Sequence, residues 1–290
     1  MDRNSTEVAA GLRPEASDQG PVVLARVIGH RGAAGAAPEN TLAAVRKAKE
    51  LGASWIEFDV KLTRDGHPVL FHDDRLERTT DGYGPVAATT FAQIRRLDAG
   101  AWFSPAFRGE RVPMFEDVLA LCIELGLGIN VEIKPCRRRE AETAQAAVGA
   151  LLRLWPQSLP APVVSSFAPE CLRVARELAP ELPRGYLTGR LPRDWQGLMA
   201  RYGCTTLHLD QRWLSVRHRT TVVAAGVPLV LYTVNDGERA RRHLEAGVAA
   251  VITDHIGRIL GSIVPTSTRA PDRSAAPSSG ASSRPGALEP

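Results

Sequence analysis

The feature that most constrains the fold is an eightfold alternation of short apolar segments with amphipathic segments. The short segments are rich in valine, isoleucine and leucine, as buried parallel strands are, and lie near residues 23–30, 55–60, 128–133, 163–166, 184–188, 205–209, 228–233 and 250–254. Helical patterns follow at residues 41–51, 115–125, 140–155, 169–178, 194–202, 215–225, 236–246 and 255–262. A strand followed by a helix, repeated eight times, predicts an α/β protein with a (β/α)8 TIM barrel.

The main alternative for this alternation is an open, doubly wound sheet. Such sheets usually carry a Gly-x-Gly-x-x-Gly turn after their first strand. Here the first strand is followed by HRGAAGAAPENT at residues 30–41, which does not match that pattern. We therefore favour the closed barrel, because a barrel of roughly 250 residues is an ordinary single domain.

One long loop interrupts the regular alternation between the second strand and the second helix. It runs from Thr63 to Pro113 and contains an Asp65-Gly66 turn and a short extra strand at residues 68–72. Loops that follow barrel strands lie at the face where catalysis occurs, and long loops in compact domains are usually functional. We expect this small insertion, at about residues 74–113, to cover the active site. The alternative is a loop that only decorates the surface.

Both ends of the chain are expected to be disordered. Residues 1–21 are polar and residues 265–290 are rich in proline, serine and alanine, so neither segment has enough apolar area to bury. The barrel domain is therefore expected to span residues 22–264. The first segment lacks the apolar run of a signal peptide, and the apolar stretches elsewhere are only as long as strands. We expect a cytoplasmic protein without stable membrane insertion.

The composition argues against several other classes of protein. With 44% hydrophobic and 23% charged residues, the chain has the composition of an ordinary globular protein. The net charge is +4 and the basic residues are scattered, so we predict no nucleic-acid partner. The four cysteines lack the spacing of a zinc site. No sequence feature indicates an oligomeric state.

Acidic residues gather on two of the predicted strands. Side chains alternate along a strand, so Glu57 and Asp59 in WIEFDVK share one side, as do Glu132 and Lys134 in INVEIKP. Three inward carboxylates are costly unless a cation neutralises them, and all-oxygen ligands favour a hard ion. We predict a site for one divalent cation, with Mg²⁺ first and Ca²⁺ or Mn²⁺ as alternatives. The other interpretation is that some of these residues face the helices and pair with arginine.

Histidines and cations are predicted beside this acidic cluster. His30 and Arg31 end the first strand, and His72 ends the extra strand of the insertion. Two histidines suit general acid and base catalysis, because imidazole titrates near neutrality. Arg31 and Lys134 are suited to phosphate oxygens. Together with a metal ion these residues indicate phosphoryl chemistry, although a single histidine at a strand end is more often a hydrogen-bonded structural residue.

The segment Pro38-Glu39-Asn40-Thr41 has two interpretations. Asn40 or Thr41 is expected to cap the following helix, because both residue types are preferred at that position. The functional alternative is that Glu39 and Asn40 make a supporting contact to phosphate or to Arg31.

Three residues at the ends of later strands are less specific. His208 in LHLD and Tyr232 in LYTVN are expected either to wall a substrate pocket or to pack in the core. Asp254, which ends VITD, is a candidate cap for the last helix.

Five segments together resemble the glycerophosphodiester phosphodiesterases, most closely the short bacterial cytosolic form. They are HRGAAGAAPENT at 30–41, IEFDVKLTRDGHPVLFHDDRLERTTDG at 56–82, VEIKP at 131–135, LYTVN at 231–235 and VITD at 251–254. The resemblance implies a (β/α)8 barrel with a small inserted subdomain. It also implies hydrolysis of small-molecule glycerophosphodiesters to sn-glycerol 3-phosphate and an alcohol such as choline, ethanolamine or glycerol.

The resemblance also implies a role for each matching site residue. Glu57, Asp59 and Glu132 are assigned to the divalent ion. His30 and His72 are assigned as the acid–base pair, and Arg31 and Lys134 as the contacts to phosphate. The sequence departs from the family at Tyr232, where many relatives carry tryptophan, and in the small, apolar run AAGAA before Pro38.

Alternatives remain for both mechanism and activity. The attacking group is either the glycerol 2-hydroxyl, which gives a cyclic phosphate, or a metal-activated water. A second enzymatic interpretation is a lysophospholipase D-like phosphodiesterase, which predicts an apolar groove and membrane contact. An interpretation from another class is a non-catalytic barrel that binds phosphodiesters, for which a broken set of ligands is expected.

Overall fold

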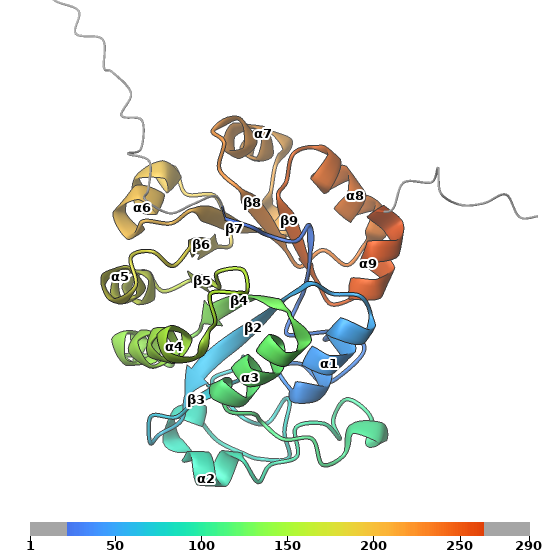
Figure 1. Ribbon diagram of the computed structural model, residues 1–290, viewed down its shortest axis with the longest axis vertical. Helices are drawn as coiled ribbons and strands as arrows, with labels where there is room; N and C mark the ends of the chain where they lie inside the picture. Colours follow the sequence, from blue (N-terminus) through green and yellow to red (C-terminus); the bar gives the residue numbers. More distant parts are fainter. Residues whose placement is uncertain (1–21, 264–290) are drawn as a thin grey trace, which may run out of the picture.

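A computed structural model describes residues 22–263, which form a closed barrel of parallel strands surrounded by helices (Figure 1). Within these residues the eight parallel strands are β1 (Val27–Gly29), β2 (Trp55–Leu62), β4 (Gly128–Ile133), β5 (Val163–Ser166), β6 (Arg184–Thr188), β7 (Thr206–Asp210), β8 (Leu229–Tyr232) and β9 (Ala250–Thr253). Each strand pairs with the next, and β1 pairs with both β2 and β9, so the sheet closes. The predicted (β/α)8 barrel is confirmed, whereas the expected disorder of residues 1–21 and 265–290 lies outside the described residues.

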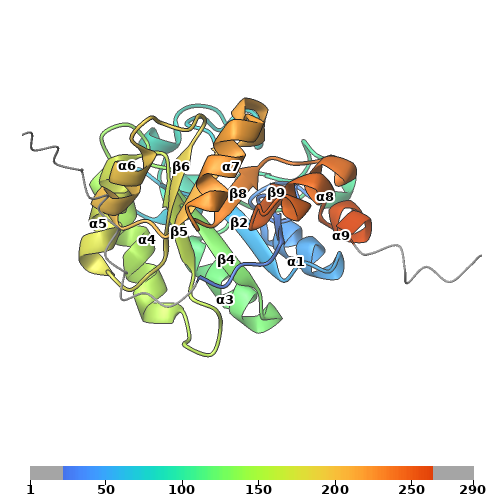
Figure 2. The same ribbon diagram turned by 90° about the horizontal axis from the view of Figure 1, so that it is seen from above.

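The helices lie around the outside of the strands (Figures 1 and 2). They are α1 (Leu42–Glu50), α3 (Phe115–Leu125), α4 (Glu140–Leu154), α5 (Pro169–Leu178), α6 (Trp195–Tyr202), α7 (Val216–Ala224), α8 (Gly237–Glu245) and α9 (Ile256–Ile263). Helix α3 ends at Gly126, which has a left-handed backbone with φ of 63°. A glycine can adopt that conformation without steric cost and so ends a helix. A glycine after an amphipathic segment therefore predicts where the helix ends.

Alternate residues of each strand face two different cores. In β2, Ile56, Phe58 and Val60 belong to the large apolar core between strands and helices. Trp55 instead belongs to a cluster made mainly of strand residues, which fills the inside of the barrel. Each fully buried side chain of this kind contributes about 1.5–3 kcal/mol relative to exposure. The same alternation turns Glu57 and Asp59 toward the barrel interior.

The first strand is shorter than its apolar pattern predicts. The expected strand at residues 23–30 is reduced to β1, and Val22, Leu24 and Ala25 pack against the inner cluster instead. The Arg26 carbonyl accepts a hydrogen bond from the Val251 amide, and the residues before Arg26 lie outside the sheet. These residues therefore contribute apolar area to the inner core without extending the strand.

The insertion, together with the preceding strand of the long loop, forms a small unit beside β2. Its elements are β3 (Pro68–Leu70), η1 (Val86–Ala88), α2 (Phe91–Ile94) and η2 (Pro105–Phe107). Strand β3 pairs antiparallel with β2 and is shorter than the predicted 68–72, so His72 lies just beyond its end. The unit has its own apolar core, which includes Val69, Leu76 and Ile94. Glu110 joins it to the barrel by accepting a hydrogen bond from the Ala43 amide at 3.2 Å.

Candidate active site

Three buried carboxylates meet on the neighbouring strands β2 and β4. Asp59 and Glu132 are register partners on these strands, and Glu57 lies two residues before Asp59. Their oxygen atoms lie within 4.8 Å of one another, and all three side chains are buried. The three carboxylates therefore form one cluster, as the alternation of side chains along the strands predicts.

The electrostatics of this cluster fit a divalent cation. Burial, followed by repulsion from Asp59 and Glu132, raises the pKa of Glu57 well above its ordinary value. Burial and then Asp59 raise the pKa of Glu132 to about 7. Carboxylates held this close lack enough positive charge among their protein neighbours to stay ionised together. A buried all-oxygen group of this kind can bind a divalent metal ion.

Backbone and amide groups fix the orientation of these carboxylates. The Arg31 amide donates to Glu57 Oε2 at 3.1 Å. Asn40 donates from Nδ2 to Asp59 Oδ2 at 2.9 Å and accepts the Asp59 amide on its Oδ1 at 3.2 Å. Asn40 has a left-handed backbone with φ of 57°, a conformation that asparagine tolerates better than most residues. Asn40 is therefore not the cap of α1: Thr41 is, since its hydroxyl accepts from the Ala44 amide at 3.2 Å.

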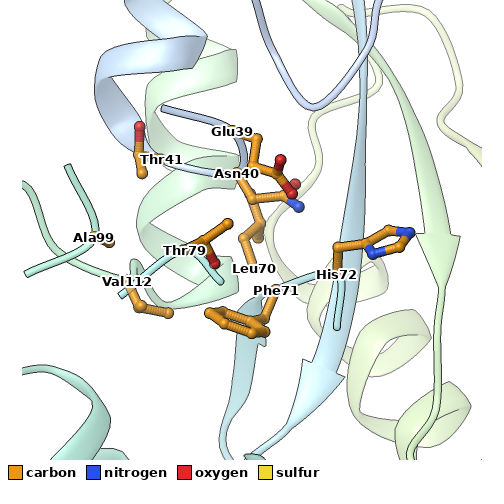
Figure 3. A pocket seen from close by; sticks show the side chains of 9 residues that line it. All are labelled: Glu39, Asn40, Thr41, Leu70, Phe71, His72, Thr79, Ala99 and Val112. Atoms are coloured by element: carbon orange, nitrogen blue, oxygen red, sulfur yellow. The ribbon is translucent and has the colours of Figure 1, made fainter. Parts of the chain in front are cut away.

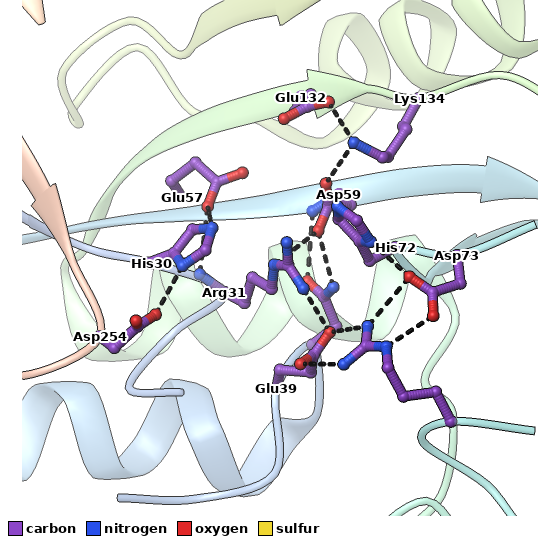
Figure 4. A network of polar contacts seen from close by, with 12 residues as sticks. His30, Arg31, Glu39, Glu57, Asp59, His72, Asp73, Glu132, Lys134 and Asp254 are labelled. Carbon is purple, nitrogen blue, oxygen red and sulfur yellow. Dashed lines mark hydrogen bonds and ion pairs between the residues drawn. The ribbon is translucent and has the colours of Figure 1, made fainter. Parts of the chain in front are cut away.

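Each histidine of the site is held by an aspartate on the same ring nitrogen. His30 Nδ1 lies 2.6 Å from Asp254 Oδ1, and His72 Nδ1 lies 2.6 Å from Asp73 Oδ1 (Figure 4). An acceptor at Nδ1 keeps the proton there, so Nε2 of each ring is free to exchange a proton with a ligand. His30 Nε2 lies 4.0 Å from Glu57 Oε2, at the edge of the acidic cluster.

His72 is suited to be neutral in the free protein. Burial lowers its pKa, with a partial offset from the nearby Asp59 charge and a further lowering by Arg31. A neutral imidazole can accept a proton at neutral pH, as a general base requires. The expectation that both histidines lie at one site therefore agrees with their positions, and their catalytic roles remain a prediction.

Asp254 was not recognised from the sequence as a partner of His30. It was a candidate helix cap, but its Oδ1 contacts His30 and its Oδ2 accepts from Asn235 Nδ2 at 2.6 Å. Asn235 Oδ1 in turn accepts from the Asp254 amide at 2.9 Å. The signal that indicates this role is an acidic residue at the end of the last strand, because a closed barrel places that strand beside the first.

Two cations lie beside the acidic cluster. Arg31 donates from Nη1 to Glu39 Oε1 at 2.6 Å, and its Nε lies 3.3 Å from Asp59 Oδ2. Lys134 Nζ lies 2.9 Å from Glu132 Oε1 and 3.7 Å from Asp59 Oδ1. Burial acts to lower the pKa of both groups, but their carboxylate neighbours outweigh it and raise both values. Both side chains therefore stay charged beside the site.

His208 and Tyr232 lie in different surroundings. His208 is 1% exposed inside the barrel, with Nε2 2.9 Å from the Thr206 hydroxyl, and burial lowers its pKa to about 3. This matches the core-packing interpretation rather than a pocket wall. Tyr232 lies at the mouth, where its hydroxyl donates to the Thr188 carbonyl and its ring meets Phe167 edge-on. The sequence interpretation missed Phe167, whose ring centroid lies 5.6 Å from Lys134 Nζ.

A hollow between the barrel and the insertion adjoins the site (Figure 3). Glu39, Asn40 and His72 line it together with residues of the insertion such as Thr79 and Val112. The insertion thus packs against the segment that carries Glu39 and Asn40. The insertion therefore lies beside the site, and its role as a cover of the active site stays a prediction.

The mouth of this barrel combines buried carboxylates, aspartate-held histidines and two cations, an arrangement that suits chemistry on phosphate groups. The model of the Glycerophosphoryl diester phosphodiesterase family matches residues 30–258 of this sequence. The chain therefore belongs to the glycerophosphoryl diester phosphodiesterase family, as its motifs predict.

Similar proteins of this kind occur in several bacteria. A glycerophosphodiester phosphodiesterase of Caldanaerobacter subterraneus subsp. tengcongensis is 36% identical over 230 residues, which cover 79% of this chain and 93% of the relative. A phosphodiesterase of Oleispira antarctica, solved in complex with the product sn-glycerol-3-phosphate, is 39% identical with a TM-score of 0.81 and covers 83% of this chain and 97% of its own. A glycerophosphodiester phosphodiesterase of Agrobacterium tumefaciens is 27% identical with a TM-score of 0.67, and the match covers 82% of this chain and 100% of that one. Among residues 22–263, none of the helices is long and apolar enough to cross a membrane.

Proposed function

We propose that this protein hydrolyses glycerophosphodiesters to sn-glycerol 3-phosphate and an alcohol, using one divalent cation and two histidines. The observation that carries the proposal is the pair of histidines, each held at Nδ1 by an aspartate, beside an acidic cluster and two cations. The product bound to the Oleispira relative supports the substrate class. Belonging to the same family, this chain is expected to take glycerophosphodiesters as its small-molecule partners.

Glu57, Asp59 and Glu132 would hold the cation, for which Mg²⁺ is the first choice and Ca²⁺ or Mn²⁺ are alternatives. When bound, a divalent cation supplies positive charge that stabilises the charge developing on phosphate oxygens.

Arg31 and Lys134 bind the non-bridging oxygens of the phosphate. Among the described contacts, Arg31 uses Nη1 and Nε, which leaves the Nη2 donors for a ligand. Positive charge placed in advance where negative charge develops lowers the barrier without reorganisation. Phe167 and Tyr232 form the apolar side of the same mouth.

The two histidines divide the proton transfers. One Nε2 accepts the proton of the attacking hydroxyl as the new P–O bond forms, and the other Nε2 donates a proton to the departing alkoxide as its P–O bond breaks. Asp254 and Asp73 stabilise whichever imidazole becomes charged. The attacker is either water or the glycerol 2-hydroxyl, and the second route forms a cyclic glycerophosphate that water then opens. Chemical quenching during turnover, followed by a search for cyclic glycerophosphate, distinguishes them, because only the second route passes through the cyclic species.

The activity is tested with purified protein and glycerophosphocholine, coupled to detection of glycerol 3-phosphate, with Mg²⁺, Ca²⁺, Mn²⁺ or chelator. We expect release that depends on the metal and is lost in Glu57→Gln. No release from folded protein with any ion refutes the proposal. Choline released from lysophosphatidylcholine but not from glycerophosphocholine would indicate the lysophospholipase D-like alternative, and binding of either compound without turnover would indicate the non-catalytic one.

A further inference from the structure

Arg78, in the insertion, has no hydrogen bond to the acidic cluster or to the two histidines. It does bind two carboxylates, one of which contacts Arg31 and the other His72. Its Nε and Nη2 donate to Asp73 at 2.6 and 3.0 Å. Its Nη1 and Nη2 donate to Glu39 at 2.8 and 2.7 Å. Both contacts use two parallel hydrogen bonds, the strongest geometry an arginine makes with a carboxylate.

Each of these carboxylates is shared with a residue of the proposed chemistry. Glu39 Oε1 accepts from both Arg31 and Arg78, and Figure 4 shows Glu39 beside Arg31. Asp73 Oδ1 contacts both His72 Nδ1 and Arg78. One guanidinium thus stands a single carboxylate away from both a phosphate-binding cation and an acid–base histidine.

The guanidinium is nearly saturated by these contacts. Arginine has five N–H donors, and four of them point at Glu39 and Asp73. Only one donor remains for a substrate, so a role through the carboxylates is favoured over direct phosphate binding. Although burial acts to raise them, the pKa values of both carboxylates are lowered, with hydrogen bonds from Arg78 the largest opposing cause.

Hydrogen bonds hold the backbone around Arg78 in a turn. The Thr80 amide and hydroxyl both donate to the Leu76 carbonyl, at 3.1 and 2.8 Å, which closes a turn around position 78. Leu76 is 1% exposed within the core of the insertion. Asp74, four residues before Arg78 in the sequence, pairs with the buried Lys61, with 2.6 Å between Nζ and Oδ1. A side chain presented by such a turn can fix the orientation of its partners.

We propose that Arg78 is a positioning residue that connects the two halves of the active site. Through Glu39 it orients Arg31 toward phosphate. Through Asp73 it orients His72 for proton transfer. This inference rests on the proposed function, because it assumes that these two residues act on one phosphodiester.

The test compares Arg78→Met, which keeps the length of the side chain, with Arg75→Met as a matched control. Arg75 is an exposed arginine of the same insertion that pairs with Glu77 and not with the site. We expect Arg78→Met to lower kcat/KM about 10- to 100-fold, as loss of supporting contacts usually does, through both a lower kcat and a higher KM. Arg78→Lys should lie between, because an ammonium group cannot make both forked contacts. Arg75→Met should stay within twofold of the unmodified protein.

Double variants separate positioning from general damage. If Arg78 acts on kcat through Asp73, adding Arg78→Met to Asp73→Asn should change kcat by less than about threefold. If it acts on KM through Glu39, adding Arg78→Met to Glu39→Gln should likewise change KM by less than about threefold. Losses that multiply in both backgrounds, or equal losses in Arg75→Met, overturn the proposal.

Binding keeps this inference distinguishable from the proposed function. Calorimetric titration with sn-glycerol 3-phosphate, counted per folded molecule, should show weaker binding for Arg78→Met and unchanged binding for Arg75→Met. If the unmodified protein turns over no phosphodiester, the proposed function fails, while this titration still supports or overturns the link between Arg78 and Arg31. Equal affinity of Arg78→Met and unmodified protein overturns that link.

Discussion

Replacing Asp254 by asparagine should impair turnover strongly while leaving the fold intact. The carboxylate bridges His30 Nδ1 on one oxygen and Asn235 Nδ2 on the other. An asparagine cannot satisfy both, since one of its ends is a donor. If the oxygen faces His30, two amide donors meet at Asn235. If the amide is turned, Asn235 is satisfied, but a donor then faces His30 Nδ1 and drives the ring proton to Nε2.

The second orientation avoids an unsatisfied contact, but it removes the acceptor from His30 Nδ1. As a base, the ring would then have no free Nε2, and as an acid it would lack the carboxylate that stabilises the imidazolium. A hydrogen bond to a charged group contributes about 1.5–3 kcal/mol, which corresponds to roughly 10- to 150-fold in rate. The same substitution behind a catalytic histidine elsewhere costs about 10⁴-fold because of the tautomer. For Asp254→Asn we therefore expect kcat to fall by about 10²- to 10⁴-fold.

Steady-state kinetics with glycerophosphocholine and saturating Mg²⁺ measure the effect. Asp236→Asn is the matched control, because Asp236 caps α8 through the Arg239 amide and asparagine caps helices equally well. A kcat for Asp254→Asn within threefold of the unmodified protein, or an equal loss in Asp236→Asn, would refute the role assigned to this aspartate.

Three further predictions concern the metal, the second histidine and the backbone. His72→Ala should lower kcat by about 10²- to 10⁴-fold with unchanged Mg²⁺ affinity in calorimetry, and an unchanged rate would remove His72 from the mechanism. The folded-state pKa of Glu132, about 7, lies above its ordinary value near 4.5, so the unfolded chain binds fewer protons between these values. The free energy of unfolding of metal-free protein should thus fall as pH rises through this window. Mg²⁺ or Glu132→Gln should flatten that slope in urea titrations, and a slope unaffected by either would contradict this account. Gly32→Ala should cost about 1–3 kcal/mol in the same titrations, because Gly32 has φ of +85° and an added Cβ would lie 2.7 Å from the Ala44 backbone; unchanged stability would contradict it.

The fold was predictable because each strand carries its own pattern. Alternation in WIEFDVK separates Phe58, which packs outward against the helices, from Glu57 and Asp59, which face inward. Once a closed barrel is assumed, strands that follow one another lie side by side. The meeting of Glu132 with Asp59 then follows from register alone.

Contacts across long sequence separations were not predictable in the same way. Asp254 is 224 positions from His30, and no local pattern distinguishes a histidine partner from a helix cap. Asn40 lies 19 positions from Asp59, and the local pattern favours a helix cap for it over a contact to the site. Phe167 lies in a loop, where periodicity carries no information about orientation. These residues depend on how loops of separate strands meet above the barrel, which hydrophobic patterning does not determine.

The pairing of β1 with β9 has a consequence for how activity arises during synthesis. His30 belongs to the first strand of the barrel and its partner Asp254 follows the last. A chain still being translated holds nearly all of the site residues but cannot form this pair until residue 254 has left the ribosome. Turnover therefore requires the completed barrel. In a refolding experiment that measures product release, activity should appear only when β1 and β9 have paired.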